Sequence, residues 1–229
     1  MPPCPGRYCS ARLGSAPHRV VGAAGLLGGV LNVVAVVALR EVPHTYAPGD
    51  VPAWLAETLA HPTASTVSAV SFTVGLVLLA AFFGGLAATS MVARRSVAVV
   101  AAVLFGGGAL LDAAGTPAVI AALHSSSSDV GVALLWVTLL LDSAFNALLG
   151  LGLVVFAFAL GAGAPRWVRV WAFVAGLASL PVGLQFLSDS FARLLAVSGP
   201  LWLGWIFVVS VRLMMDSPHP EPSPQGERG

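Results

Sequence analysis

Residues 134–150 read LLWVTLLLDSAFNALLG, and they lie inside an apolar run that extends from about residue 130 to residue 160. A run of this length exceeds the roughly 20 residues that a helix needs to cross a bilayer. Asp142 and Asn146 stand near its middle, four residues apart and therefore on one face of a helix. A carboxylate at that depth is costly and marks either a packing contact or a functional site. The stretch predicts a spanning helix with a polar centre.

The composition of the whole chain agrees with a membrane protein. Of its 229 residues, 57% are hydrophobic and only 9% are charged, whereas soluble domains carry about 25% charged residues. The chain therefore lacks the charge to cover a water-facing surface, and its net charge of +1 gives no indication of a nucleic-acid partner. All 11 basic residues are Arg, which, with the excess of Ala, Val, Leu and Gly, is typical of a bacterial protein.

The sequence predicts an all-α polytopic membrane protein, a single bundle of six transmembrane helices. Pro117 is expected to bend or end the third span, and Pro181 to kink the fifth. Gly25 and Gly29 form a small-xxx-small pair that favours close helix packing. The six spans are expected at about residues 20–39, 65–91, 97–123, 130–160, 170–191 and 197–215, between disordered tails at residues 1–18 and 216–229.

Arginine positions predict the orientation. With the N-terminus inside, nine arginines fall in inner segments and only Arg40 and Arg193 fall in outer ones. Both termini are therefore expected to be cytoplasmic, in a bacterial inner membrane. In the long outer segment, residues 40–64, a helix of two turns is expected at residues 53–60, with Trp54 and Leu55 dipping into the headgroup region.

Most polar residues of the spans belong to the outer half. Asp142 lies roughly 18 Å below the outer end of its helix, near the midplane, and Gln185, Asp189 and Arg193 recur every four residues as one expected stripe. We therefore predict an outward-facing polar cavity with Asp142 as its floor, against the alternative that these groups only form hydrogen bonds between helices. The candidate residues are Asp112, Asp142, Asn146, Gln185, Asp189, Arg193, Asn32 and His124.

The sequence carries no motif that would identify an enzyme. It has no Walker loop, no HExxH, no GxSxG and no pair of histidines at helical metal spacing. Cys4 and Cys9 are too few for a closed zinc site or a disulfide framework. No catalytic residue, cofactor or metal ligand is predicted, and two membrane aspartates without the Tyr-Asp and Gly-x-Gly-Asp contexts do not indicate an intramembrane protease.

Three stretches also carry a recognisable sequence pattern: LLLDSAFNALLGLGL (139–153), APRWVRVWAFVAGL (164–177) and PLWLGWIFVVSVRLM (200–214). They resemble small bacterial integral membrane proteins of uncharacterised families such as domain of unknown function 4386. Asp142 and the Arg166-Trp167 pair match that pattern, whereas the Pro-rich tails and the serines at 125–128 depart from it. The resemblance implies an inner-membrane protein of six or seven helices with no assigned activity.

Three function classes stay open at this point. The first is a structural or regulatory membrane protein that acts through partners, for example by holding a cytoplasmic factor; besides the lipid bilayer, the partners expected for the chain are a homo-oligomer or another membrane protein. The second is a small-solute transporter or channel subunit that uses the outer cavity and assembles through the glycines of the first span. The third is a membrane enzyme on lipid-linked substrates, with Asp112, His124 or Asp189 as its base.

Overall fold

The computed structural model describes residues 16–43, 45–46 and 48–215. In this range the chain is all-helical and has no β-strand; Val92 and Leu160 pair only as an isolated bridge. Most of the two predicted tails, with Cys4 and Cys9, lies outside the described residues. The elements are α1 (Ala16–Ala38), η1 (Leu39–Glu41), η2 (Pro48–Asp50), α2 (Val51–Ala60), α3 (Pro62–Leu86), α4 (Arg95–Leu123), α5 (Ser128–Ala159), α6 (Arg166–Ser179), η3 (Leu180–Leu187), α7 (Asp189–Arg193) and α8 (Leu195–Met215).

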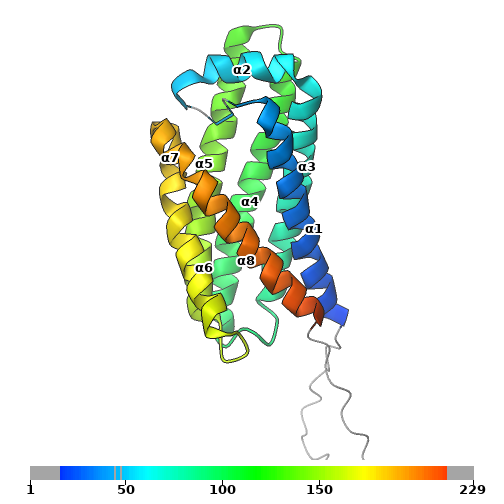
Figure 1. Cartoon of the computed structure of the whole chain (residues 1–229), viewed down its shortest axis with the longest axis vertical. Helices are drawn as coiled ribbons and strands as arrows, with labels where there is room; N and C mark the ends of the chain where they lie inside the picture. The colour runs from blue at the N-terminus through cyan, green and yellow to red at the C-terminus, as the bar shows by residue number, and fades with distance from the viewer. Residues whose placement is uncertain (1–15, 44, 47, 216–229) are drawn as a thin grey trace, which may run out of the picture.

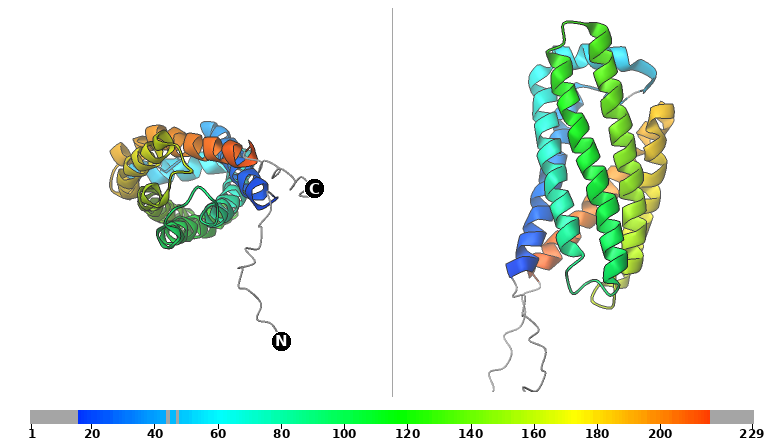
Figure 2. Two further views of the ribbon diagram at one scale, coloured as in Figure 1. Left: turned by 90° about the horizontal axis from the view of Figure 1, so that it is seen from below. Right: turned by 180° about the vertical axis from the view of Figure 1, so that it is seen from behind.

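Six helical segments are long and apolar enough to cross a membrane, as predicted: His18–Glu41, Pro62–Leu86, Arg95–Leu123, Ser128–Ala159, Arg166–Leu187 and Asp189–Met215. They form a closed ring in chain order, in which each segment packs against the next and α8 returns to α1. The ring is visible from below in Figure 2, and α8 crosses the front of the bundle diagonally between α6 and α1 in Figure 1. The start of α1 and the end of α8 lie at the same end of the bundle.

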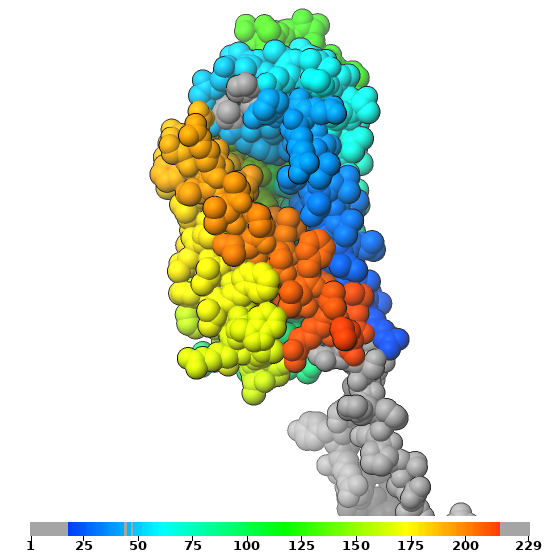
Figure 3. All heavy atoms as spheres, in the orientation of Figure 1, coloured from blue at the N-terminus to red at the C-terminus, as the bar shows by residue number. Residues whose placement is uncertain are grey.

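We call that end the terminal end and the opposite one, which carries α2 and the α4–α5 turn, the cap end (Figure 1). The α2 helix lies across the cap end, and in the space-filling view its atoms lie just below those of the α4–α5 turn (Figure 3). Trp54 and Leu55 are only 2% and 6% exposed because they point into the bundle. The expectation that they dip into the headgroups is wrong, because the apolar face of α2 packs against the cap end of the bundle instead.

The half of the ring toward the terminal end is filled by aromatic side chains. Phe83 stacks on Phe105 with ring centroids 3.7 Å apart, and it also packs against Phe156 and Trp205. The indole of Trp205 donates a 2.9 Å hydrogen bond to the Val168 carbonyl, which joins α8 to α6. This aromatic cluster, defined by Phe82, Phe83, Phe105, Phe156 and Trp205, is fully buried.

Small residues permit the close contacts of the ring. A Cβ on Gly25 would collide with Phe82 of α3, and one on Gly29 would lie 2.9 Å from Phe207 of α8. The predicted role of these glycines in helix packing is confirmed, and their partners belong to the same chain. The glycines of α1 are therefore already engaged and do not offer the surface for self-association that was expected.

Proline has different effects in the two spans that contain it. The α4 helix continues through Pro117 to Leu123, so this proline does not end the span. At the fifth span, α6 ends at Ser179 and the chain tightens into the 3-10 segment η3 as Pro181 enters. The predicted irregularity at Pro181 thus extends over eight residues.

Candidate functional site

Asp142 lies on α5 about midway along the helix and is 3% exposed. Asn146, one turn later, donates from Nδ2 to the Asp142 Oδ2 at 3.0 Å and to the Asp142 carbonyl at 2.9 Å. Gln185 of η3 donates from Nε2 to the same Oδ2. One carboxylate oxygen thus receives two side-chain amide donors, which stabilise negative charge on it.

Asp112 reaches the same point from α4. Its side chain is fully buried, and its carboxyl group contacts that of Asp142 closely enough for the two to share a hydrogen bond. A carboxylate only accepts hydrogen bonds, so this contact requires a proton on one of the two groups. No described group donates a hydrogen bond to either oxygen of Asp112. The two membrane aspartates, whose meeting the sequence could not show, form one carboxyl pair.

The 3-10 segment η3 brings Gln185 to this pair. Gly150 of α5 and Gly176 of α6 face each other so closely that a Cβ on either would lie within 2.8 Å of the other's carbonyl oxygen. One turn toward the cap end, a Cβ on Gly183 would lie 2.7 Å from the Cβ of Ala147. Because these contacts hold η3 against α5, Gln185 is fully buried and its amide faces Asp142.

Tyr46 completes the site, although the sequence analysis did not select it. It lies in the loop before α2, its ring packs on Trp54 at 5.2 Å between centroids, and its φ of 62° places it in the left-handed region. That conformation costs a non-glycine residue about 1–2 kcal/mol. The residue is half-buried: its burial raises the pKa of Tyr46 well above 10, and the charges of Asp142 and then Asp112 raise it further.

A small cavity lies between Tyr46 and the α2 cap. Its volume of about 20 Å³ is enough for one water molecule. The hydroxyl groups of Thr58 and Ser65, which are fully buried, have no hydrogen-bond partner in the structure. We call this cavity the hydroxyl chamber; the hydroxyl-bearing residues that line it are Thr45, Tyr46, Thr58, Ser65, Ser68 and Thr116.

The other four predicted residues lie away from the carboxyl pair. Asn32 is buried against α3 but donates to the Gly28 carbonyl of its own helix, at 2.8 Å. Asp189 accepts a 3.2 Å hydrogen bond from the Gly49 amide and so ties α7 to the loop before α2. Arg193 and His124 are exposed at the cap end.

The predicted stripe of Gln185, Asp189 and Arg193 does not exist. It required a continuous α-helix, in which residues four apart share a face. The chain instead passes from η3 to a break at Ser188 and then to the short α7. Gln185 therefore points inward, Arg193 points outward, and no ion pair within the described range joins Arg193 to Asp189.

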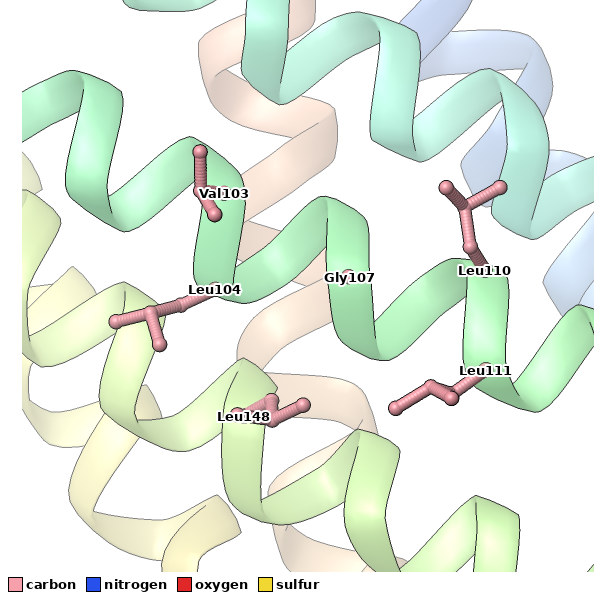
Figure 4. A pocket seen from close by; sticks show the side chains of 6 residues that line it. All are labelled: Val103, Leu104, Gly107, Leu110, Leu111 and Leu148. Atoms are coloured by element: carbon pink, nitrogen blue, oxygen red, sulfur yellow. The ribbon is translucent and has the colours of Figure 1, made fainter.

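A surface groove is a different feature. A groove of about 420 Å³ lies between α4 and α5 and is lined by Val103, Leu104, Gly107, Leu110, Leu111 and Leu148 (Figure 4). Every lining side chain is apolar, and Val103 is 67% exposed. The groove offers no group for chemistry, so the candidate site is the carboxyl pair with its two amides and Tyr46.

This site can take up and release a proton, because its two contacting carboxyls and its phenol are acids. No basic group is found among the described groups that surround them. The described residues hold no group of three His, Cys, Asp or Glu side chains that would bind a metal ion. In comparisons with family models, curated proteins and solved structures, the chain matches none of them.

Proposed function

We propose that this chain is a regulatory protein of the bacterial inner membrane whose Asp112–Asp142 pair takes up and releases a proton from the outer side. In this proposal the cap end faces outward and both termini are cytoplasmic. The arginines support that orientation, since the terminal end carries Arg94, Arg95, Arg166 and Arg169 at its two inter-helix turns, whereas the cap end carries only Arg40 and Arg193.

The single observation that carries the proposal is the isolation of Asp112. It is fully buried, the carboxyl group beside it belongs to another acid, and no described cation compensates its charge. Two carboxylates in contact in a medium of low dielectric constant cannot both stay ionised. The pair therefore holds at least one proton, and a change in its proton number changes the net charge at the centre of the bundle.

The difference between the two halves of the bundle supports a regulatory role rather than continuous proton conduction. Tyr46, the hydroxyl chamber and the α2 cap lie on the outer side of the pair, whereas the aromatic cluster fills the other side. A proton that enters from outside thus meets a polar region first and then a packed apolar core. The event that a partner protein could detect is the repacking of η3, α2 and Tyr46 around a pair whose charge has changed.

The test uses a fluorophore on Ala56, an exposed residue of α2, in a chain carrying Ala56→Cys, Cys4→Ser and Cys9→Ser. A membrane-impermeant maleimide labels only those molecules in liposomes whose cap end faces the external buffer. We expect the fluorescence to follow external pH with one transition and to ignore internal pH. The Asp112→Asn and Asp142→Asn variants should lose the transition, while Asp129→Asn, an exposed cap-end acid, should keep it.

The same labelled position tests the orientation in cells. If the cap end faces outward, the impermeant maleimide reacts with Ala56→Cys in intact cells, and it does not react with a cysteine placed at the terminal end. The reverse pattern would contradict the proposed topology. A fluorescence that does not depend on external pH, or a transition that survives in both Asn variants, would contradict the proposed function.

One observation favours a second candidate, a proton-coupled transporter. Ion and substrate sites of transporters are often formed where a spanning helix is interrupted near the midplane, and η3 interrupts the fifth span beside the pair. The chamber has room for one water molecule only, so this candidate needs a second conformation. Proton flux into reconstituted liposomes that is lost in Asp142→Asn would favour the transporter; fluorescence changes without flux favour the regulator.

A further inference from the structure

We propose that the hydroxyl chamber holds an ordered water molecule, and that this water and Tyr46 form the route by which protons reach the Asp112–Asp142 pair from outside. The proposal rests on the proposed function, since it names the path to the same pair. It adds a binding site for water and a relay residue, and neither follows from the pair alone.

The chamber meets the physical requirements of a water site. Its volume of about 20 Å³ exceeds the roughly 10–15 Å³ that one water needs, and a buried water needs two to four polar partners. Thr58 on α2 is 0% exposed and Ser65 on α3 is 3% exposed, and each has a hydroxyl without a partner. An unsatisfied buried hydroxyl costs about 1–3 kcal/mol. One water between these hydroxyls would satisfy both of them.

Tyr46 connects the chamber to the pair. It lines the chamber, and its hydroxyl is close enough to Asp142 and Asp112 for the charge of each to raise its pKa. Thr116, which also lines the chamber, lies one turn of α4 beyond Asp112 toward the cap end. Tyr46 thus lines the water site and lies near the carboxyls. Its left-handed backbone, with φ of 62°, is the kind of strain that persists where a position is functionally constrained.

The relay step conserves charge and protons. A hydronium ion in the chamber gives a proton to the Tyr46 oxygen, and in the same event the Tyr46 O–H proton passes to an ionised carboxylate of the pair. The chamber keeps a neutral water, Tyr46 stays neutral with the other proton, and the pair gains one proton. No tyrosinate persists at any point, consistent with the raised pKa of Tyr46.

The groups that face this path are three acids and two amides. From α4 comes Asp112, from α5 Asp142 and Asn146, from η3 Gln185, and from the loop Tyr46 itself. No described basic side chain faces them, so a proton on the path meets only neutral or negative groups.

The experiment is a pH jump in a stopped-flow instrument, with the labelled Ala56 position as reporter in liposomes. We expect Tyr46→Phe to slow the response to external pH by roughly a hundredfold while its final amplitude stays at the wild-type value. Phe keeps the ring and the backbone preference of Tyr, so the packing on Trp54 is retained. Thr58→Val, which replaces the hydroxyl by a methyl group of the same shape, should slow the response in the same way because it removes a ligand of the water.

Thr73→Val is the matched control, because Thr73 lies on α3 outside the chamber and bonds only to the Ala69 carbonyl of its own helix. It should leave both rate and amplitude unchanged. Wild-type rates in both Tyr46→Phe and Thr58→Val would overturn the relay while leaving the pair intact. Loss of amplitude in Asp112→Asn tests the pair separately, so that failure of the relay and failure of the proposed function are distinguishable.

Discussion

Gly183→Ala is the substitution that most directly tests how the site is positioned. Gly183 lies in η3 at the point where this segment touches α5. A Cβ at this position would lie 2.7 Å from the Cβ of Ala147 and 3.1 Å from its Cα and backbone nitrogen. Optimal carbon contacts need about 3.5–4.0 Å, and two of the three atoms belong to the backbone of α5. The segment η3 must therefore move away from α5 by roughly 1 Å.

The expected cost has two parts. Overpacking of a tight contact costs about 1–3 kcal/mol. The displacement also lengthens the hydrogen bond from Gln185 to Asp142, a bond to a charged group worth about 1.5–3 kcal/mol when intact. With partial loss of that bond, we expect Gly183→Ala to lower the free energy of unfolding by about 2–4 kcal/mol. Since Gln185 stabilises the ionised carboxylate, the pair should also hold its proton more tightly, and the fluorescence transition should move to higher pH.

The assay is reversible unfolding in mixed micelles of mild detergent and dodecyl sulfate, followed by tryptophan fluorescence. The matched control is Gly107→Ala on α4, where an added Cβ has no neighbour within 4 Å. This change should stabilise the protein by about 0.5–1 kcal/mol, because alanine restricts the unfolded chain. Equal unfolding free energies for the two variants would refute the close contact between η3 and α5, and with it our account of how Gln185 reaches Asp142.

Three further outcomes follow from named contacts. In a Tyr8→Phe background the only tyrosine is Tyr46, and tyrosinate absorbance should appear only well above pH 10. Because the raised pKa means that folding favours the neutral phenol, this contribution to stability is present below about pH 10 and is lost as pH rises through the raised pKa; a normal tyrosinate transition in folded protein would contradict the burial of Tyr46. Asp50→Ala removes the acceptor of the 3.0 Å bond from the Ala53 amide and should cost about 1 kcal/mol at the start of α2, seen as faster hydrogen exchange there and nowhere else. Trp205→Phe removes the hydrogen bond to Val168 and leaves a void, so we expect a loss of about 1–3 kcal/mol; a loss below 0.5 kcal/mol would show that this link between α6 and α8 carries little stability.

The sequence predicted the spans well, because hydropathy and length are properties of single helices. The same holds for Asp142 and Asn146, whose spacing of four residues fixes a shared face in any α-helix. The packing role of Gly25 could also be inferred from the sequence, since small-xxx-small spacing indicates close helix packing. These inferences needed no knowledge of which helices are neighbours.

The site as a whole could not be predicted, because it depends on which helices are neighbours. Whether Asp112 meets Asp142 depends on the order of helices around the ring, on which hydropathy carries no information. Gln185 was selected as part of a regular helical stripe, but it reaches Asp142 only because the chain around it is a 3-10 segment. Tyr46 gave no periodic signal because it lies in a loop, and its inward direction depends on a left-handed backbone that a tyrosine rarely adopts.

The carboxyl pair itself can be tested by infrared difference spectroscopy on protein reconstituted in bilayers, through the C=O stretch that only a protonated carboxyl shows. We predict one pH-dependent carboxyl band that exchanges in heavy water, and we predict that Asp112→Asn and Asp142→Asn each abolish it, since the two residues share the proton. Two separate bands, each surviving substitution of the other aspartate, would contradict the contact between Asp112 and Asp142. A single band that neither exchanges nor responds to pH would show that the pair only packs the bundle.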